Sequence, residues 1–585
     1  MNYALESQPP RPKLSAWQAA RELFPLLRGE QLSLLYSALA TLGNALVNLS
    51  APLLVAHVVD SYLLVGQFDG VLRYAGLLLL LYLLGLCTSY LHTRLMGGVG
   101  QRVLFSVRSR IFAKLQELPV AFFHANKTGD LISRINNDTD KLNAFFSHTL
   151  VQFMGSIVIM TGAGLFLLLL NPLLGMAALA PALLLVLFTR VLSPWVKRRN
   201  AAAMAATGTL SAEVAESLGN FRVIVAFNRR DFFRQRLEQA NRQNYASALQ
   251  AGLANQVFTP VFGLAAMLAQ LLVLVGGVGL IAAGELSAGL LISYLSYVTY
   301  FYNPLRQLAL LWSNFQVALA SWDRIETILE LRSLLPQLSV LPPLAQAPLL
   351  ELRGVSFGYL PGRPVLRDLS LQLARGKTYA LVGPTGGGKT TTASLMARLY
   401  DPDEGSVLFE GRDLRSVPAA ERARRIGFIL QEPVLFSGSV RDNLLYGAPE
   451  LVKLPEAELA ALLAQQGMAP LLQRFDGGLQ APVLGGGDNL SLGQRQLIAF
   501  MRAVLRQPDL LILDEATANI DTVTEQALEQ ILQRLPAQTT RVVIAHRLNT
   551  IESADEIFFV NGSTLTHAAS MQQAVELLLH QKKHS

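Results

Sequence analysis

Five stretches of this 585-residue chain contain no Asp, Glu, Lys or Arg, and they restrict its fold more than any other feature. They cover residues 31–59, 74–93, 142–189, 243–284 and 286–305. A helix needs about 20 apolar residues to cross a bilayer. The stretch 142–189 is long enough for two crossings, and the pair Asn171-Pro172 predicts a turn within it. The sequence therefore predicts six spanning helices, at roughly 31–59, 71–96, 143–170, 173–194, 255–280 and 286–312.

The composition agrees with a membrane protein that carries a soluble portion. Hydrophobic residues make up 51% of the chain and charged residues only 16%, whereas soluble domains are roughly a quarter charged. Such an apolar chain is not a disordered one. Cys87 is the only cysteine, which excludes an internal disulfide framework and a multi-cysteine metal site.

The basic residues lie in alternate connections between the predicted spans. The links at 61–69, 171–172 and 281–288 contain no Lys or Arg, whereas the links after the second and fourth helices are long and basic. Because positive charge is retained on the cytoplasmic side, both termini are predicted to be cytoplasmic, in a plasma membrane such as the bacterial inner membrane. Helical patterns continue through the long links, which predicts helices that project beyond the bilayer and turn back.

The chain divides into four predicted parts. Residues 1–30 form an N-terminal segment whose residues 14–29 suit either an amphipathic helix on the inner leaflet or a solvated helix. Residues 31–332 form an all-α transmembrane domain, and the proline-containing stretch 333–348 is a linker. Residues 349–585 alternate short apolar runs with helical patterns, which predicts an α/β domain with a parallel sheet core.

The predicted α/β domain contains a phosphate-binding loop. The pattern G-x-x-x-x-G-K-[ST] follows an apolar run at 378–382 and precedes a helical pattern, which is the context that a P-loop requires. Backbone N–H groups of the loop and the helix N-terminus favour phosphate. Lys389 would reach the β- and γ-phosphates, and the Thr390 hydroxyl would bind Mg²⁺. The predicted nucleotide-binding residues here are Gly383, Pro384, Thr385, Gly386, Gly387, Gly388, Lys389, Thr390 and Thr391.

Two further apolar runs end in residues suited to hydrolysis. The run 510–513 ends in Asp514 and Glu515, and the run 541–545 ends in His546. Ligands of parallel α/β sheets bind at the carboxyl ends of the strands. Asp514 is predicted to hold the metal, and Glu515 to act as general base toward the attacking water. For His546 a structural role is the alternative to a contact with the γ-phosphate.

With these motifs the chain resembles half-transporters of the ATP-binding cassette (ABC) exporter family, of the multidrug and lipid type with the type IV fold. Leu490-Ser-Leu-Gly-Gln494 is similar to the family signature, and Asp514-Glu-Ala-Thr-Ala-Asn-Ile-Asp521 to Walker B plus the D-loop. Gln431 occupies the Q-loop position, which the resemblance assigns to catalysis and Mg²⁺. The resemblance also implies nucleotide contacts from Tyr359, Ser491, Gly493, Gln494 and Asp521.

The resemblance extends to the cytoplasmic links and implies a mechanism. Residues 122–138 look like the family's first coupling region and residues 219–227 like the approach to the second, although both would also suit plain cytoplasmic helices. In the family, each ATP lies between the P-loop of one nucleotide-binding domain and the signature of another. The implied cofactors are ATP and Mg²⁺, and the implied partner is a second ABC half-transporter.

Four departures from the family pattern concern the composite ATP sites. Leu492 replaces a signature glycine, and Gly387 stands where Ser or Ala is usual. The segment Gly485-Gly-Gly-Asp488 before the signature lacks the Glu of the frequent Gly-Glu-x-Gly pattern, and Asn519 replaces a common Ala. Glu515 is intact. Unequal sites would result, which favours a heterodimer over a homodimer.

A substrate surface is predicted inside the membrane. Aromatic residues of the sixth predicted span recur at helical spacing near mid-membrane, away from the interfacial belts. Helix packing is the alternative for these aromatics, and interhelical hydrogen bonding is the alternative for two asparagines of the first span. The predicted substrate residues are Asn44, Asn48, Tyr294, Tyr297, Tyr300 and Phe301.

The function predicted from the sequence is ATP-driven export of hydrophobic or amphipathic compounds, either drugs or lipids, by alternating access. Import of a small ligand such as a metal chelate and an ATP-gated regulatory role are the alternatives. A net charge of +7 could indicate nucleic-acid binding, but the six spans and the inward placement of positive charge argue against a nucleic-acid repair ATPase.

Overall fold

The computed structural model describes residues 23–331, 337–344, 346–360, 362–514, 522–544, 552–561 and 564–568, with isolated positions elsewhere that include Tyr3 and Leu5. They form two compact units. One unit comprises the described residues of Pro10–Leu115 and Gly129–Glu330, and it is helical. The other comprises those of Met1–Pro9, Gln116–Thr128 and Leu331–Ser585, and it contains all the strands that the structure describes.

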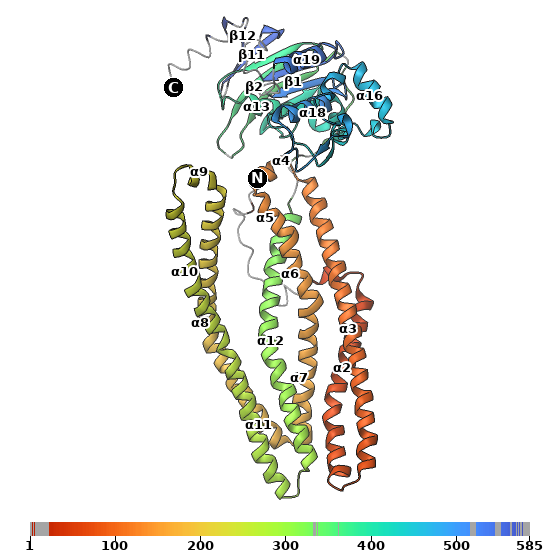
Figure 1. Cartoon of the computed structure of the whole chain (residues 1–585), viewed down its shortest axis with the longest axis vertical. Coiled ribbons are helices and arrows are strands. Elements are labelled where there is room, and N and C mark those ends of the chain that lie inside the picture. Colours follow the sequence, from red (N-terminus) through yellow and green to blue (C-terminus); the bar gives the residue numbers. More distant parts are fainter. Residues whose placement is uncertain are drawn as a thin grey trace. The chain divides into compact units, whose positions relative to one another are not determined.

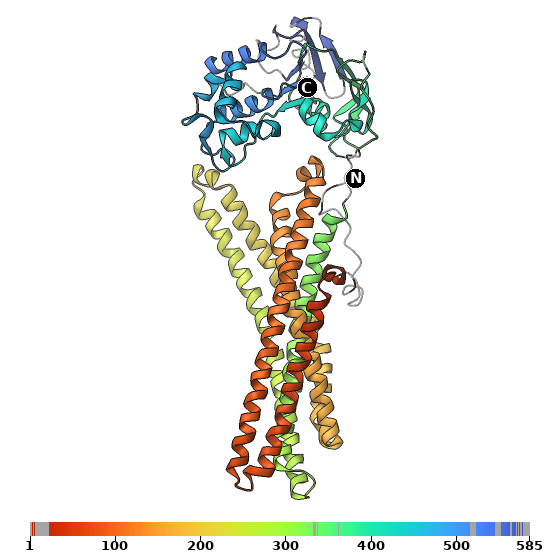
Figure 2. The same ribbon diagram turned by 90° about the vertical axis from the view of Figure 1, so that its right-hand side faces the viewer.

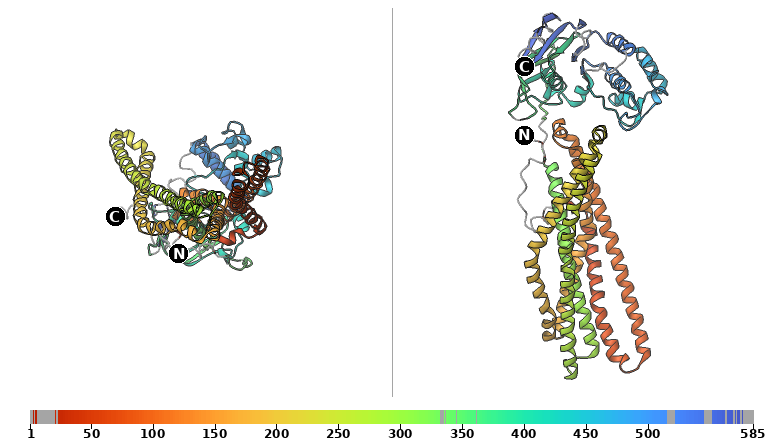
Figure 3. Two further views of the ribbon diagram at one scale, coloured as in Figure 1. Left: turned by 90° about the horizontal axis from the view of Figure 1, so that it is seen from below. Right: turned by 60° about the vertical axis from the view of Figure 1, so that its left-hand side comes forward.

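Long helices build the first unit, and they run side by side along its length (Figures 1 and 2). The α8–α10 pair diverges from the remaining helices at one end, as the view along the unit also shows (Figure 3). The long helices are α2 (Gln31–Val58), α3 (Phe68–Glu117), α7 (Leu150–Leu170), α8 (Pro172–Gly219), α10 (Arg230–Gln256), α11 (Phe258–Ala282) and α12 (Ala288–Leu329). The shorter elements are η2 (Phe24–Leu27), η3 (Val59–Leu63), α5 (Thr128–Ser133), η4 (Arg134–Asp138), α6 (Thr139–Ala144), η5 (Phe145–Thr149) and α9 (Phe221–Ala226).

The breaks between the long helices follow local sequence signals. Asn171 caps α8, since its side chain accepts a 3.1 Å hydrogen bond from the Leu174 N–H, and Pro172 stands at the first helical position. The hairpin predicted at Asn171-Pro172 is therefore confirmed. Asp60 accepts hydrogen bonds from the Ser287 hydroxyl and the Gly289 N–H, which joins η3 to the start of α12.

Five helical stretches in the described part of the chain are long and apolar enough to cross a membrane. They are Gln31–Leu63, Phe68–Glu117, Thr128–Leu170, Pro172–Gly219 and Arg230–Ala282. The sixth predicted span coincides with the first half of α12, which is a continuous helix of 42 residues but is outside this set. The count of six spans stays a prediction.

The parallel sheet core that the sequence predicts is present in the second unit, and the described residues add a four-stranded antiparallel sheet and a two-stranded pair. The six-stranded sheet has the order β12-β11-β3-β10-β9-β6, and all its neighbours are parallel except β12. Its strands are β3 (Thr378–Val382), β6 (Ile426–Ile429), β9 (Leu510–Asp514), β10 (Thr540–Ile544), β11 (Glu556–Asn561) and β12 (Thr564–Ala568). The four-stranded antiparallel sheet has the order β2-β1-β4-β5, from β1 (Leu350–Phe357), β2 (Leu366–Leu373), β4 (Glu404–Phe409) and β5 (Arg412–Asp413).

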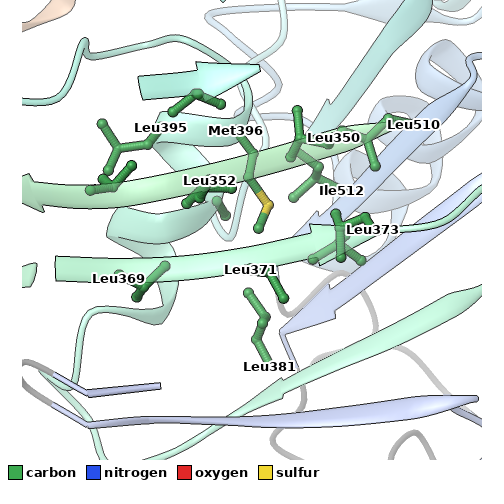
Figure 4. Packing of buried hydrophobic residues seen from close by; sticks show 14 of the residues in the cluster. Leu350, Leu352, Leu369, Leu371, Leu373, Leu381, Leu395, Met396, Leu510 and Ile512 are labelled. Carbon is green, nitrogen blue, oxygen red and sulfur yellow. The ribbon is translucent and has the colours of Figure 1, made fainter. Parts of the chain in front are cut away.

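The core of this unit lies between the two sheets and around α13 (Lys389–Met396). Leucines of β1 and β2 meet Leu381 of β3, Met396 of α13 and Ile512 of β9, and all of these side chains are buried (Figure 4). Burial of apolar area at about 25 cal/mol per Å² stabilises this arrangement. The packing fixes α13, and therefore the loop before it, against the carboxyl end of β3.

A second cluster gathers short helices around α18 (Leu492–Val504). Leu497, Ile498 and Phe500 of α18 are buried in it together with Leu513 of β9. The other elements of this region are α15 (Val440–Leu445), α16 (Glu456–Gln465), α17 (Ala469–Leu472), α19 (Thr522–Gln533), and the short pair β7 (Gly438–Ser439) and β8 (Pro482–Val483). Outside both clusters lies α14 (Ala419–Arg425).

The helix α4 (Val120–Ala125), within the first predicted coupling region, belongs to the unit that holds the sheets. Val120 packs against the core between the sheets, and Phe122 is fully buried. The Asn126 side chain donates to the Tyr3 carbonyl and accepts from the Leu5 N–H, at 2.9 Å each. The N-terminal segment is thereby attached to α4.

Candidate nucleotide site

The loop between β3 and α13 has the backbone that a phosphate cradle requires. Gly383, Gly386 and Gly388 have positive φ angles of 147°, 80° and 100°, which L side chains rarely adopt. A Cβ atom at Gly383 would stand 2.1 Å from the Val560 carbonyl oxygen, so glycine is also needed for close approach to β11. The N–H groups at the start of α13 end this loop and favour an anion.

Lys389 places a positive charge inside the loop. Lys389 is only 5% exposed, and its Nζ donates hydrogen bonds to the carbonyl oxygens of Gly383 at 2.9 Å and Pro384 at 3.0 Å. A buried ammonium group within a glycine-rich loop fits a phosphate chain. Thr391 is buried and Thr390 is exposed on the first turn of α13.

Asp514 and Gln431 lie at the same sheet edge as the loop. Asp514 is the last residue of β9 and is 3% exposed, and Gln431 follows β6 by two residues. The strands β3, β10, β9 and β6 are parallel neighbours, and their carboxyl ends meet at one edge. The oxygen atoms of Thr390, Gln431 and Asp514 are the ligand type that Mg²⁺ prefers, so these residues fit that ion.

Three predicted catalytic and nucleotide residues lie outside the described part of the chain. They are Glu515, Asp521 and His546. Glu515 follows β9 directly, and His546 comes two residues after the last residue of β10. Their roles remain predictions from the sequence.

Tyr359 presents an aromatic ring beside the loop. Its hydroxyl lies 3.1 Å from the Thr391 hydroxyl, which ties it to α13. The edges of the Phe357 and Tyr400 rings hold it, with centroids 5.1 and 5.3 Å from that of Tyr359. The residue is still 49% exposed, so it retains surface on which a nucleotide base could stack.

Tyr400 belongs to none of the sequence motifs. Its ring also meets the ring of His124 on α4, at 6.4 Å and nearly perpendicular, and thus links α4 to the aromatic group around Tyr359. Tyr400 lies 41 residues from Tyr359 and much farther from α4 in the chain. Only the folded structure brings the three together.

Ser491 begins α18 and is exposed. Its hydroxyl accepts from the Gln494 N–H at 3.1 Å, while the Gln494 side chain accepts from the Ser491 N–H at 2.9 Å, which forms a capping box. Leu492 is 37% exposed, and Gly493 follows it on the first turn. The signature residues therefore form a helix N-terminus on a surface, with N–H groups that would suit an anion.

The packing around residue 387 explains why glycine stands there. A Cβ atom there would stand 2.8 Å from the Val560 carbonyl oxygen and 3.0 Å from that of Pro384. Contacts this short require a neighbouring backbone atom to shift. In this chain the absence of a side chain at residue 387 allows the close approach of β11.

The predicted substrate residues are in the helical unit, where several of them take part in helix packing. Tyr294 and Tyr297 have no exposed surface, and their hydroxyls donate to the carbonyls of Leu167 at 2.9 Å and Leu49 at 2.6 Å. Tyr300 and Phe301 are partly buried. This arrangement is what the packing alternative predicts, and the substrate role of these residues stays a prediction.

The two asparagines form a hydrogen-bonded pair. The Asn44 amide donates to the Gly85 carbonyl of α3 at 3.0 Å, and Asn48 donates to the Asn44 side chain at 2.9 Å. Asn44 therefore bridges α2 and α3. It also lines a polar cavity, described below.

A P-loop domain on a chain with several membrane-capable helices defines the class: an ATP-driven membrane protein. The family described as ABC transporter transmembrane region matches residues 34–305, and the family described as ABC transporter matches residues 366–518. A fatty acid ABC transporter ATP-binding/permease protein of Mycobacterium tuberculosis is 33% identical over 84% of this chain and 78% of its own length.

Two further relatives cover most of the chain. An ATP-dependent lipid A-core flippase of Escherichia coli is 30% identical over 96% of both proteins. A mitochondrial potassium channel ATP-binding subunit of Xenopus tropicalis is 32% identical over 94% of this chain and 81% of its own length. The chain belongs to the ABC transporter family. It is a multi-pass membrane protein of the half-transporter exporter type, an ATPase coupled to transport.

Proposed function

We propose that this chain exports lipids or other hydrophobic compounds across a bacterial inner membrane, with both termini in the cytoplasm. The observation that supports this most directly is the joining, in one chain, of a formed phosphate cradle around Lys389 to five helices able to span a membrane. The names of two relatives, a fatty acid transporter and a lipid A-core flippase, favour lipid over other substrates.

The active form is proposed to be a dimer. The exposed N-terminus of α18 offers Ser491, Gly493 and Gln494 to an ATP molecule held by another subunit's P-loop. The substitution of Leu492 for glycine and the presence of Gly387 favour a related but different half-transporter as the partner.

Each group of the site has a proposed task in hydrolysis. Lys389 and the loop N–H groups bind the phosphates, Tyr359 stacks on the base, and Glu515 takes the proton from the attacking water. Thr390, Gln431 and Asp514 would hold Mg²⁺, which supplies charge neutralisation at the phosphates when bound. His546 is proposed to contact the γ-phosphate, and Asp521 to contribute to nucleotide binding.

Hydrolysis drives transport only if ATP binds one arrangement of the helices more tightly than the other. The helix α4, whose Val120 and Ala121 pack against the core between the sheets, is the proposed point at which closure of the nucleotide site is passed to the membrane helices. Loss of the γ-phosphate then releases the closed arrangement.

The test is transport by purified protein in vesicles, with a panel of labelled lipids and lipophilic drugs. We expect ATP-dependent movement of at least one lipid class, abolished by Glu515→Gln and retained by Glu529→Gln, the same change at an exposed position of α19. Measuring the mass of the complex formed by this chain alone separates a homodimer from a required second chain. Absence of ATP-dependent movement with a full partner present would contradict the proposal.

A regulatory subunit is the second candidate, because the Xenopus relative is named as a channel's ATP-binding subunit. The two functions differ in their use of ATP. An exporter needs turnover, so a lipid substrate should stimulate its ATPase, whereas a gated subunit should respond to ATP binding alone and should retain its response in Glu515→Gln.

A further inference from the structure

Two adjoining cavities lie among the helices of the first unit, and their linings differ in polarity. The larger has a volume of about 670 Å³ and is almost wholly apolar, with walls from η2, α2, α3, η5, α7 and α12. The smaller, about 320 Å³, is lined by five hydroxyl-bearing residues, two histidines and three amide side chains. We call them the apolar chamber and the polar chamber. Both are within the usual size range of small-molecule sites.

The chambers meet at three residues that line both of them: Thr41, His92 and Val151. His92 Nδ1 lies 2.9 Å from the Ser37 hydroxyl and 2.8 Å from the Thr41 hydroxyl, so this side of the ring is held by α2. Among the described residues nothing hydrogen-bonds to Nε2. Nε2 can therefore donate to a ligand at the junction in one tautomer and accept from it in the other.

The described lining of the two chambers lacks carboxylate, ammonium and guanidinium side chains. None of the described residues around either chamber is Asp, Glu, Lys or Arg. The hydroxyls and amides can pair with a hydrogen-bonding group, but a phosphate or an ammonium would meet no Asp, Glu, Lys or Arg counter-charge in that lining, and burying such a charge within a membrane is costly. The complementary ligand is therefore an amphiphile with one long apolar part and an uncharged polar head.

The four α-helices that contribute to both chambers, α2, α3, α7 and α12, place them in the same order, although the two ranges overlap on α7. On α2 the apolar chamber takes residues 31–41 and the polar chamber Thr41 and Asn44. On α12, which runs the opposite way, the polar chamber takes Gln307 and the apolar chamber residues 311–315. The ranges on α3 and α7 agree. The polar chamber thus lies nearer the middle of the bundle, and the apolar chamber nearer the end where α2 begins.

We infer that the two chambers form one binding site for a single-chain amphiphile with an uncharged head, such as a sugar or polyol, held with its head toward the membrane centre and its chain toward the cytoplasmic end of the bundle. The orientation rests on the proposed function and its cytoplasmic termini. A lipid of the inner leaflet has the reverse orientation. A bound molecule is therefore already inverted, as a step of outward movement requires.

The test uses the fluorescence of Trp312, which lines the apolar chamber. The full chain, in lipid nanodiscs, carries Trp17→Phe, Trp195→Phe and Trp322→Phe, so Trp312 alone reports. The probes are dodecyl glucosides brominated at the chain end or next to the head, since bromine quenches a nearby indole. A second protein that keeps only Trp195, which lines neither chamber, reports partition into the surrounding lipid.

We expect the chain-end bromine to quench Trp312 several times more strongly than the head-proximal bromine, with no such difference at Trp195. Across alkyl glucosides of increasing length, affinity should rise about fourfold per methylene until the chamber is full, which is the transfer free energy of a buried CH₂ expressed as a ratio. Stronger quenching by the head-proximal bromine would overturn the inverted orientation.

Variants locate the site. Ala38→Phe fills the apolar chamber and should weaken binding at least tenfold, while Ala75→Phe, at an exposed position of α3 outside both chambers, should not. Gln152→Leu alters only the polar chamber and should weaken the glucoside but leave quenching by a bromoalkane unchanged. Should Ala38→Phe fail to fold, Gln152→Leu carries the test.

Two results would reject the site itself. One is quenching that Ala38→Phe and Gln152→Leu both leave unchanged, and the other is tighter binding of dodecyl phosphate than of dodecyl glucoside. If either occurs while vesicle transport of another lipid is still abolished by Glu515→Gln, the site is wrong and the proposed export stands. If transport is absent but the glucoside binds as expected, the site stands and the export proposal falls.

Discussion

The ring of Tyr359 rests edge-on against the ring of Tyr400, with 5.3 Å between centroids and 87° between planes. Tyr400 in turn meets His124 of α4. The aromatic surface proposed for the nucleotide base is therefore one ring away from the helix proposed to couple the two parts of the transporter. A movement of Tyr359 on nucleotide binding would shift Tyr400, and Tyr400 would then press on His124 of α4.

Replacing Tyr359 by Ala should weaken ATP binding by roughly tenfold, because aromatic stacking on a base is worth about 1–3 kcal/mol. Tyr359→Phe keeps the ring and loses only the hydrogen bond with Thr391, so its affinity should remain close to that of the native protein. Equilibrium binding of a fluorescent ATP analogue measures both. Equal losses in the two variants would indicate that the hydroxyl, and not the ring, is important.

Removal of the Tyr400 hydroxyl is expected to leave the protein's stability unchanged or to increase it. The hydroxyl is buried, and it has no hydrogen-bond partner among the described residues. A buried hydroxyl without a partner costs about 1–3 kcal/mol. Tyr400→Phe should therefore leave the melting temperature of the purified protein unchanged or raise it, whereas Tyr400→Ala should lower it, since it removes the contact between Phe357, Tyr359 and His124. A marked fall for Tyr400→Phe would contradict this account.

Ser491 has two separable roles, the cap of α18 and the proposed contact with a facing ATP. Ser491→Ala should lose the cap, at a cost of about 1 kcal/mol, together with ATPase activity. Ser491→Asp preserves an N-cap acceptor but sets a negative charge toward the nucleotide phosphates. We expect it to melt like the native protein and to lose nearly all ATPase activity. Retained activity in Ser491→Asp would remove this helix end from the ATP site.

How much of this the sequence could predict depended on the range of the contacts. Local patterns predicted the P-loop, the turn at Asn171-Pro172 and the strand that ends in Asp514, because each depends on residues next to one another in the chain. The antiparallel sheet was missed because β1 pairs with β2 and β4 across loops whose patterns carry no register information.

The aromatic residues of α12 show the same limit. Spacing of three and four placed them on one face, but a helical pattern does not say whether that face meets a neighbouring helix or a substrate. Tyr297 finds the Leu49 carbonyl 248 residues away and stacks on Phe166 at 5.3 Å. No local signal could have identified either partner.

Glu410 predicts the acid sensitivity of the nucleotide-binding part. Hydrogen bonds from Arg425, at 2.6 and 2.7 Å, lower the pKa of the Glu410 carboxyl below its ordinary value. A carboxyl group with a lowered folded-state pKa adds stability above its unfolded pKa of about 4.3 and loses it as the pH falls through the folded value. The melting temperature should thus fall from pH 5 toward pH 3.

Glu410→Gln tests that assignment. It should destabilise the protein at pH 7 by about 2 kcal/mol, since a charged hydrogen-bonding partner is lost, and it should flatten the dependence between pH 5 and pH 3. Glu529→Gln, at an exposed position of α19, is the matched control and should follow the native curve. A native-like slope in Glu410→Gln would assign the acid sensitivity to other carboxylates, of which Glu421, also held by Arg425, is the next candidate.

Substitutions of Tyr297 distinguish the packing interpretation of the α12 aromatic residues from the substrate interpretation. Tyr297→Ala would empty a fully buried ring position, at about 3–5 kcal/mol, so a loss of transport there would report misfolding and not substrate contact. Tyr297→Phe removes only the 2.6 Å hydrogen bond to Leu49 and should cost about 1 kcal/mol. If the ring serves packing alone, Tyr297→Phe keeps both basal and lipid-stimulated ATPase activity. A native melting temperature and basal rate combined with lost lipid stimulation would instead show that the hydroxyl is released from Leu49 to contact substrate during turnover.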